Sequence, residues 1–173
     1  MASCTSGNDG QAREAARTIT HATVGSPTTA PTPPPMPTYP TAGRVQTPAG
    51  AEAAFRHYVD SYIWAFANSD PAPLIGLTVE GCVFCNSVRE DLADMQSRGE
   101  RARGGELVIH GLQVTRGNVR TEMMLAINMS QKAGVALGRD GAPVATTTAE
   151  PQRRVYALMQ WVNDLWLLRE VAF

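Results

Sequence analysis

Between Pro48 and Asn68 the apolar residues return every three or four positions. They form a single stripe made of Phe55, Tyr58, Val59, Tyr62, Ile63 and Phe66. This period predicts one long amphipathic helix that packs its stripe on a core. Thr47 is a preferred N-cap and Pro48 is a favoured first-turn residue, so we expect the helix to begin there.

Two shorter helices are predicted after the first. Ser69-Asp70-Pro71 marks the end of the long helix and the start of a short one that runs to Leu77, with Asp70 as its cap. Ser87-Val88-Arg89-Glu90 has the form of a capping box and predicts that a third helix begins there. Gly99 then supplies a C-cap.

After Gly104-Gly105 the apolar period changes to two. Alternation predicts strands over residues 106–115, 119–129, 135–137, 155–161 and 165–173. Asp140-Gly141 and Asn163-Asp164 are turn signals between them. Three helices followed by about five antiparallel strands predict an α+β fold in which the helices pack on the sheet.

The last two predicted strands, 155–161 and 165–173, are apolar on both sides of their alternation, and the final one is the example here. One side carries Leu165, Leu167 and Val171, and the other carries Trp166, Leu168 and Ala172. One side is expected to pack on the helices. A second copy of the chain is a candidate cover for the other side, which would give a homodimer through the outer face of the sheet.

Composition changes near residue 47. Residues 1–48 hold 8 of the 12 prolines, together with many Thr, Ser and Ala residues. Such a segment buries too little apolar surface to offset its ordering entropy. We therefore predict a disordered Pro/Thr-rich tether over 1–46 and one folded domain over 47–173. The net charge of −1 on 173 residues argues against a basic nucleic-acid-binding protein, and no apolar run has the length of a bilayer span.

The start of the chain resembles a lipidation signal. Met1-Ala2-Ser3-Cys4 looks like the last residues of a bacterial lipobox, in which small residues precede a cysteine that becomes lipidated. The alternative is a cysteine that stands there by chance. A lipidated Cys4 followed by the tether predicts a protein that is anchored to the cell membrane by its lipid and is extracytoplasmic.

Two motifs of the folded part carry a resemblance. Tyr58…Tyr62…Ser69-Asp70…Leu74…Leu77 and the closing Trp166-Leu167-Leu168 resemble the nuclear-transport-factor-like, or SnoaL-like, cone fold. With the Pro-rich tether and Cys82-Val83-Phe84-Cys85, residues 36–173 resemble a family of actinobacterial lipoproteins known only as a domain of unknown function. The resemblance implies three helices on a curved sheet, with a pocket between the first helix and the sheet.

Cys82 and Cys85 stand just before the predicted third helix. In an exported protein the preferred interpretation is a structural disulfide. A thiol pair that exchanges disulfides is a second interpretation, although the element order is not that of a thioredoxin. A zinc site is the third, and it would have to recruit two more ligands, such as His57 and His110.

Tyr58, Tyr62 and His110 are the candidates for acid–base chemistry in the implied pocket, with Asp60 as a further member. Each also has a structural interpretation. Buried tyrosines usually have satisfied hydroxyls, and a single histidine on an apolar strand face is usually a hydrogen-bonded core residue. Catalysis would require the histidine to lie close to a carboxylate, which spacing alone does not establish.

His57, Asp60 and Trp64 lie opposite the apolar stripe by helical phase. They form either a solvated helix face or a contact surface. Trp64 is the best indication of a contact, with the tether, a second chain or a neighbouring protein as the alternatives.

Three functions are compatible with these patterns. The preferred one is a membrane-tethered extracytoplasmic lipoprotein that binds a small apolar ligand or a partner protein. The second is a SnoaL-like isomerase, hydrolase or cyclase, and the third is a thiol–disulfide oxidoreductase that uses Cys82 and Cys85. The sequence has no phosphate-binding glycine loop, zinc-protease motif or nucleophile elbow, so neither a cofactor nor a metal is expected.

Overall fold

The computed structural model describes residues 34–117 and 120–173. The expected lipidation site at Cys4 and the tether before residue 34 lie outside the described residues. The elements follow in this order: η1 (Thr41–Arg44), α1 (Pro48–Asn68), η2 (Ala72–Leu74), α2 (Val83–Arg98), β1 (Arg101–Gly104), β2 (Leu107–Arg116), β3 (Glu122–Gln131), β4 (Gly134–Leu137), β5 (Pro143–Thr147), β6 (Glu150–Val162) and β7 (Leu165–Ala172).

The first helix begins where the sequence predicts. The Thr47 hydroxyl accepts a hydrogen bond from the Gly50 backbone N–H at 3.1 Å, and Pro48 occupies the first turn. The helix ends at Ser69, whose φ of 51° is the left-handed conformation typical of a C-cap.

The predicted set of three helices is wrong. The described residues hold two α-helices, because the expected second helix is only the 3₁₀ turn η2. There Asp70 Oδ1 accepts from the Ala72 N–H at 2.9 Å. The helix expected from Ser87 begins at Val83 instead, with Cys82 as its N-cap. Gly99 is its C-cap, as predicted.

The predicted single sheet of about five strands is also wrong, although the α+β class is confirmed. The described strands form a four-stranded sheet, in the order β2-β3-β6-β7, and a three-stranded sheet, in the order β1-β4-β5. All neighbouring strands are antiparallel. Strands β1 and β5 were not predicted, because their side chains are almost all exposed and give no clear apolar alternation.

The two sheets meet at a crease made by glycines. Strands β1 and β2 follow one another across Gly104 and Gly105, whose φ values are 71° and 74°. The Gly105 N–H donates to the Ala133 carbonyl at 2.9 Å across the crease, and a Cβ on Gly104 would lie 2.6 Å from that same oxygen. Only glycine combines a positive φ with so close a contact to the Ala133 carbonyl. Gly104 and Gly105 therefore allow the chain to bend sharply between β1 and β2.

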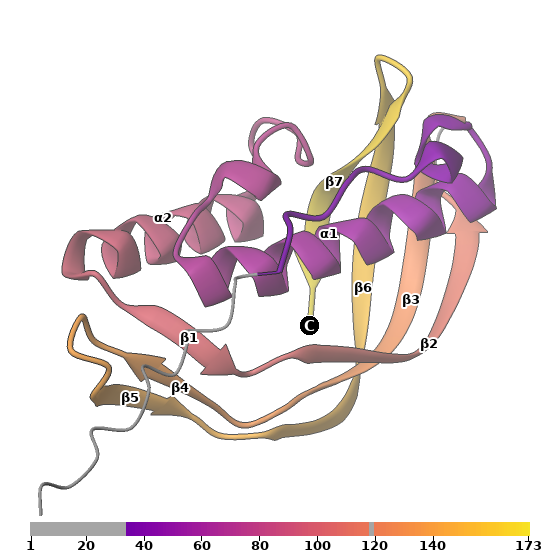
Figure 1. Ribbon diagram of the computed structural model, residues 1–173. Helices are drawn as coiled ribbons and strands as arrows, with labels where there is room; N and C mark the ends of the chain where they lie inside the picture. Colours follow the sequence, from indigo (N-terminus) through magenta and orange to yellow (C-terminus); the bar gives the residue numbers. More distant parts are fainter. Residues whose placement is uncertain (1–33, 118–119) are drawn as a thin grey trace, which may run out of the picture. The chain divides into compact units, whose positions relative to one another are not determined.

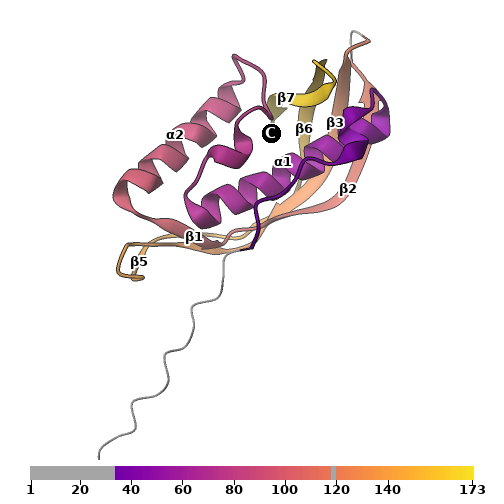
Figure 2. The ribbon, with the colours of Figure 1, turned by 45° about the horizontal axis from the view of Figure 1, so that its top comes forward.

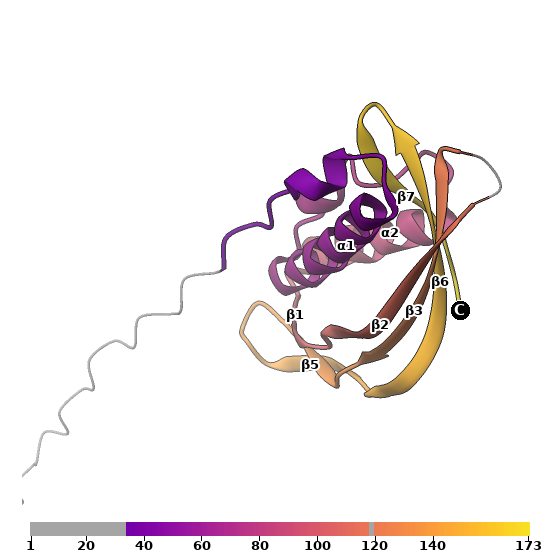
Figure 3. The same cartoon turned by 90° about the vertical axis from the view of Figure 1, so that its right-hand side faces the viewer.

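Both helices lie on one face of the curved sheet (Figures 1 and 3). The core lies between these helices and the four-stranded sheet. Its fully buried side chains come from α2, β3, β6 and β7: Leu92, Leu125, Ile127, Val155, Met159, Trp166 and Leu168. None of the described helices is long and apolar enough to cross a membrane.

A bulge in β7 changes which of its residues face the core. Leu168 pairs with Met159, but Glu170 pairs with Leu158, so Arg169 is an extra residue. Val171 therefore turns inward to the core, and the expected grouping of Leu165, Leu167 and Val171 on one side is wrong. Arg169 forms an ion pair with Glu122 at 2.6 Å.

Candidate functional site

A cavity of about 110 Å³ lies between α1, the first turn of α2 and the inner face of the four-stranded sheet. Four residues of α1 line it at positions three or four apart: Phe55, Tyr58, Val59 and Tyr62. Because this spacing puts side chains on one helix face, the predicted stripe forms the helical wall of the cavity. The cavity is slightly smaller than engineered apolar cavities of ~150 Å³ that bind benzene.

The sheet supplies the rest of the apolar wall, through Leu107, Met129, Val155 and Val171. The ring of Phe84 from α2 completes the wall and meets the ring of Phe173 edge to face, with 5.8 Å between centroids. The spacing of apolar residues did not identify Phe84 or Phe173 as site residues. For Phe84, the one available signal was its position between Cys82 and Cys85.

The rim of the cavity is polar. The Arg153 guanidinium lies 4.6 Å from the centre of the Phe173 ring and pairs with Glu150 at 3.0 Å. Ser130 and Gln131 of β3 are also part of the lining. Gln131 and Tyr62 continue into a wider groove of about 380 Å³ toward the three-stranded sheet.

The Tyr58 hydroxyl is the unusual group of this site. Tyr58 is only 4% exposed, and its hydroxyl has no hydrogen-bond partner among the described residues. Burial, then the neighbouring Tyr62, raises the pKa of Tyr58, while Arg89 acts in the opposite direction. The group is therefore a neutral donor at physiological pH. Leaving such a group unpaired in the interior costs about 1–3 kcal/mol.

Tyr62 shares the cavity with Tyr58, but the other acid–base candidates lie elsewhere. Burial and then the charge of Asp91 raise the pKa of Tyr62. His110 is exposed beside a β-bulge between Ile109 and Gly111, and its Nε2 lies 2.7 Å from the Ser130 hydroxyl. The bulge removes His110 from the apolar strand face on which the alternation placed it. Asp60 is exposed and does not line the cavity.

His57 is buried, so the solvated-face interpretation is wrong for this residue. It is 8% exposed and lies under Tyr39, with ring centroids 5.2 Å apart at 78°. Burial lowers the pKa of His57, and the charge of Asp60 opposes that shift. Tyr39 belongs to a segment whose composition predicted part of the tether. We call residues 34–46 the strap.

The strap follows α1 (Figure 2). Near its start, the Trp64 indole N–H donates to the Pro34 carbonyl at 2.8 Å, so Trp64 contacts the end of the tether, one of its three alternatives. Near its end, the Trp166 indole N–H donates to the Val45 carbonyl at 3.0 Å.

Tyr39 is the centre of the strap. Its hydroxyl lies within hydrogen-bond distance of the carbonyls of Trp166 (3.1 Å) and Gly43 (3.2 Å), and it accepts from the Trp166 backbone N–H at 3.2 Å. Burial raises the pKa of Tyr39, whereas the backbone hydrogen bond to Trp166 and the charge of Arg44 lower it by less. The Arg44 guanidinium lies 5.5 Å from the centre of the Tyr39 ring.

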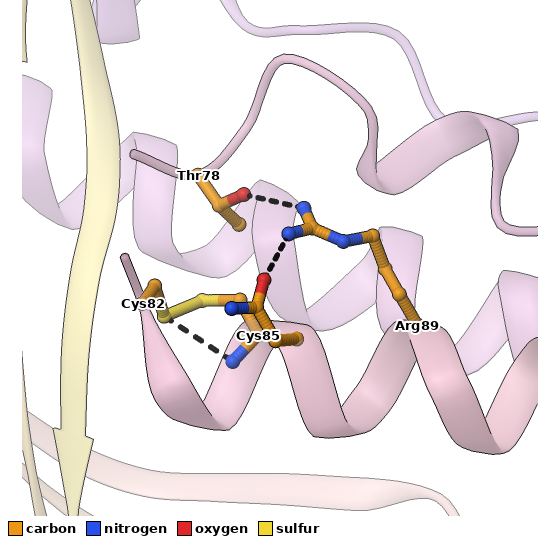
Figure 4. Close-up of a disulfide and its surroundings, with 5 residues drawn as sticks. Thr78, Cys82, Cys85 and Arg89 are labelled. Atoms are coloured by element: carbon orange, nitrogen blue, oxygen red, sulfur yellow. Dashed lines mark hydrogen bonds between the residues drawn. A yellow bond between two sulfur atoms is a disulfide. The ribbon is translucent and has the colours of Figure 1, made fainter. Parts of the chain in front are cut away.

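Cys82 and Cys85 form a disulfide at the first turn of α2 (Figure 4). Cys82 Sγ accepts from the Cys85 N–H at 3.2 Å, and the two residues are 1% and 2% exposed. Arg89, one turn further, donates to the Thr78 hydroxyl at 3.1 Å and to Asn86. Within residues 34–117 and 120–173 no group of three or more His, Cys, Asp or Glu side chains could hold a metal ion.

Comparison with solved structures finds similarity at low sequence identity, and only the first structure named here has a TM-score above 0.5. The intermembrane-space region of the chloroplast protein ARC6 is 11% identical, with a TM-score of 0.54, over 73% of this chain and 95% of that chain. Aln2 from a Streptomyces species is 11% identical, with a TM-score of 0.46, over 71% and 88% of the two chains. A candidate polyketide cyclase from Xanthomonas campestris pv. campestris is 14% identical, with a TM-score of 0.36, over 70% and 87%.

Comparison with curated proteins found no significant match. A family model does match, over residues 22–172, and its description is a family of unknown function, DUF6318. A family of unknown function was the expectation from the sequence, and that part of the expectation is confirmed. The match spans most of the folded domain and the last part of the expected tether. The chain therefore belongs to the DUF6318 family of unknown function.

Proposed function

We propose that the domain binds a small, mostly apolar molecule that carries one hydrogen-bond acceptor, and that a lipidated Cys4 holds it at the outer side of the cell membrane. The observation that carries the binding proposal is the buried, unpartnered hydroxyl of Tyr58, a residue that lines a mostly apolar cavity. A carbonyl, ester or ether oxygen of a ligand that reached this hydroxyl would accept a hydrogen bond from it and relieve the cost of the unpaired group.

The size of the cavity limits the part of the ligand that enters it. About 110 Å³ admits a single ring or a short hydrocarbon segment, and not a fused ring system. Any further part of the ligand must leave past the polar rim at Arg153 and Glu150 or along the groove beyond Tyr62. These exits favour a ligand with an apolar end and a more polar remainder.

Two probes of almost equal size test the role of the hydroxyl. Acetophenone has an acceptor oxygen where isopropylbenzene has a methyl group. We expect the wild type to prefer acetophenone by about fivefold, and Tyr58→Phe to remove that preference. Shifts of the Met129 methyl group, which lines the cavity, report binding by NMR, and the exposed Met36 serves as the reference. Absence of any Met129 shift with either probe would contradict ligand binding in this cavity.

Cys4 and the disulfide support the anchor proposal. The residues around Cys4 match the end of a lipobox, and a disulfide suits an oxidising compartment. The test is the intact mass of the protein from the membrane fraction of its own host. We expect a diacylglyceryl addition on Cys4 and the absence of two hydrogens for the Cys82–Cys85 bond. An unmodified chain with free thiols contradicts both expectations.

The two alternative functions find less support in the arrangement of side chains. An acid–base enzyme would use His110 or Asp60 beside the tyrosines, and both lie outside the cavity lining. A thiol oxidoreductase exchanges disulfides with a bulky partner protein, and both cysteines are too buried for that contact.

A further inference from the structure

Helix α2 has two N-terminal capping signals, and the structure uses the weaker one. The helix begins after Cys82, whose sulfur caps the Cys85 N–H. One turn later stands Ser87, with Glu90 three residues beyond it, which is the order of a capping box. Serine is a preferred N-cap and cysteine is not, so capping preference alone favours a start at Ser87. Ser87 is exposed in the present helix.

The disulfide explains why the earlier start is adopted. It joins the residue before the helix to the third residue of its first turn. The Cys82 carbonyl accepts the first intrahelical bond, from the Asn86 N–H at 3.0 Å. A chain closed between these two positions keeps them at the separation of a helical turn. Within this turn Val83 is 83% exposed and contributes little, so the turn is held by Phe84 and by the buried, linked Cys82 and Cys85.

That same turn carries Phe84, which separates two spaces. The cavity lies on one side of the Phe84 and Phe173 rings. On the other side is a surface groove of about 660 Å³, and Phe84, Val171 and Phe173 belong to the lining of both. The edge-to-face pair of Phe84 and Phe173 is therefore a partition between the cavity and this groove. Its position depends on the first turn of α2.

We propose that the disulfide is a latch that keeps this partition closed, and that its reduction moves the start of α2 to Ser87. A dithiol reductant supplies two electrons and two protons. The S–S bond breaks, Cys82 and Cys85 become thiols, and the reductant leaves as a disulfide. Residues 83–86 then unwind, Phe84 withdraws from Phe173, and the cavity joins the groove. The effect on ligand access rests on the proposed binding function, whereas the shift of the helix start does not.

Amide hydrogen exchange on the full chain tests the helix shift without any ligand. With a start at Ser87 the first intrahelical donor becomes Asp91 instead of Asn86. Reduction with dithiothreitol should speed exchange at residues 86–89 by about tenfold or more and leave Leu92 unchanged. Equal protection of residues 86–89 in the oxidised and reduced chains overturns the proposal.

Matched variants test whether the two caps compete. In the reduced chain, Ser87→Ala should slow the extra exchange by about fivefold, because it removes the competing cap. Ser97→Ala, near the other end of α2, should have no such effect. Cys82→Ala/Cys85→Ala should resemble the reduced wild type, whereas Cys82→Ser/Cys85→Ala should restore the start at Val83 by supplying a good cap without a cross-link. An unchanged pattern in reduced Ser87→Ala contradicts the competition.

The association rate of acetophenone tests the partition. It should rise on reduction, and oxidised Phe84→Ala should reproduce that rise, whereas Val83→Ala in the same exposed turn should not. Equal rates in all these forms would show that the partition is not the access route. If acetophenone binds in neither redox state, the binding function fails, and hydrogen exchange alone then decides the shift of the helix.

Discussion

Tyr39, which packs on α1, and Tyr58, which belongs to α1, differ in the hydrogen bonding of their hydroxyl groups. The Tyr39 hydroxyl of the strap has polar partners in Trp166 and Gly43. The hydroxyl of Tyr58, a residue that lines the cavity, has none among the described residues. Burial raises the pKa of both, so both are neutral donors.

The difference separates a structural contact from the proposed binding site. In the strap, each polar group of the Tyr39 and Trp166 contact finds a partner within the chain, so nothing there calls for a ligand. Tyr58 lines the cavity, and its hydroxyl has no partner among the described residues, which costs stability. Proteins rarely keep such groups, so this one calls for an explanation. Identical substitutions at the two positions should therefore have opposite effects.

Tyr39→Phe should give the larger effect on stability. It removes the acceptor of the Trp166 N–H and leaves buried backbone groups unpaired, at a cost of about 1–3 kcal/mol in the free energy of unfolding. Urea denaturation measures the loss. The affinity of the folded variant for acetophenone should not change. An unchanged midpoint would mean that the strap contributes nothing to stability.

Tyr58→Phe should change stability little, with the free energy of unfolding constant or higher by up to about 1 kcal/mol. The substitution removes a hydroxyl that gains no hydrogen bond within residues 34–117 and 120–173. Its affinity for acetophenone should fall by about fivefold. The same urea titration and the Met129 methyl shifts measure both quantities. A destabilisation as large as that of Tyr39→Phe would abolish the contrast, because it would mean that the hydroxyl has a structural partner.

The start of each helix shows how far the sequence determines the fold. Thr47 and Pro48 predicted the beginning of α1 because the capping chemistry is local and unopposed. Ser87 and Glu90 are an equally clear signal, yet α2 begins one turn earlier. There a covalent bond between Cys82 and Cys85 overrides a local preference, and capping rules do not include that contribution.

The strands show the same limit. Strands β3 and β6 have one buried face, so apolar residues alternate along their sequences and both strands were predicted. The exposed strand β5 gave no signal. The bulges near His110 and Arg169 shift the side-chain phase by one position, and the register of a partner strand is needed to see them. Gly104-Gly105 was visible as a break but not as a crease, because its close approach to Ala133 comes from a distant part of the chain.

Residues of the candidate site were predictable only where they come from one helix. Tyr58 and Tyr62 follow from helical spacing, which placed them on the packed face of α1. Phe84, Arg153 and Phe173 come from α2, β6 and the residue after β7, and only the tertiary fold brings them together. His57 was misplaced for the same reason, since its cover is a Pro-rich segment whose composition indicates a tether.

His57 makes the stability of the strap region depend on pH, with a smaller effect than that of Tyr39→Phe. Its pKa in the folded chain lies below the ordinary value of 6.5, so the unfolded chain takes up the proton first. The free energy of unfolding should therefore be highest above pH 6.5 and fall as the pH drops through the range between the two pKa values. Asp60 opposes this trend.

Denaturation between pH 7.5 and 5.5 measures the slope in three chains. His57→Gln should lose the contribution of this residue, and His110→Gln should keep it, because His110 is exposed. A slope that is equal in wild type and His57→Gln would show that His57 titrates alike in the folded and unfolded chains.

Trp64→Phe should have the smallest effect. The bond from the indole N–H to the Pro34 carbonyl is exposed, so water replaces it at a cost of ~0.5 kcal/mol or less. The Tyr39 contacts do not depend on it, so the strap should loosen only at its first residues. NMR relaxation should show faster motion of the Met36 amide and no change at Tyr39. Faster motion at Tyr39 as well would mean that Trp64 anchors the whole strap. The hydrogen bonds of the Tyr39 hydroxyl would then depend on the Trp64 contact, and they would not be what orders the strap.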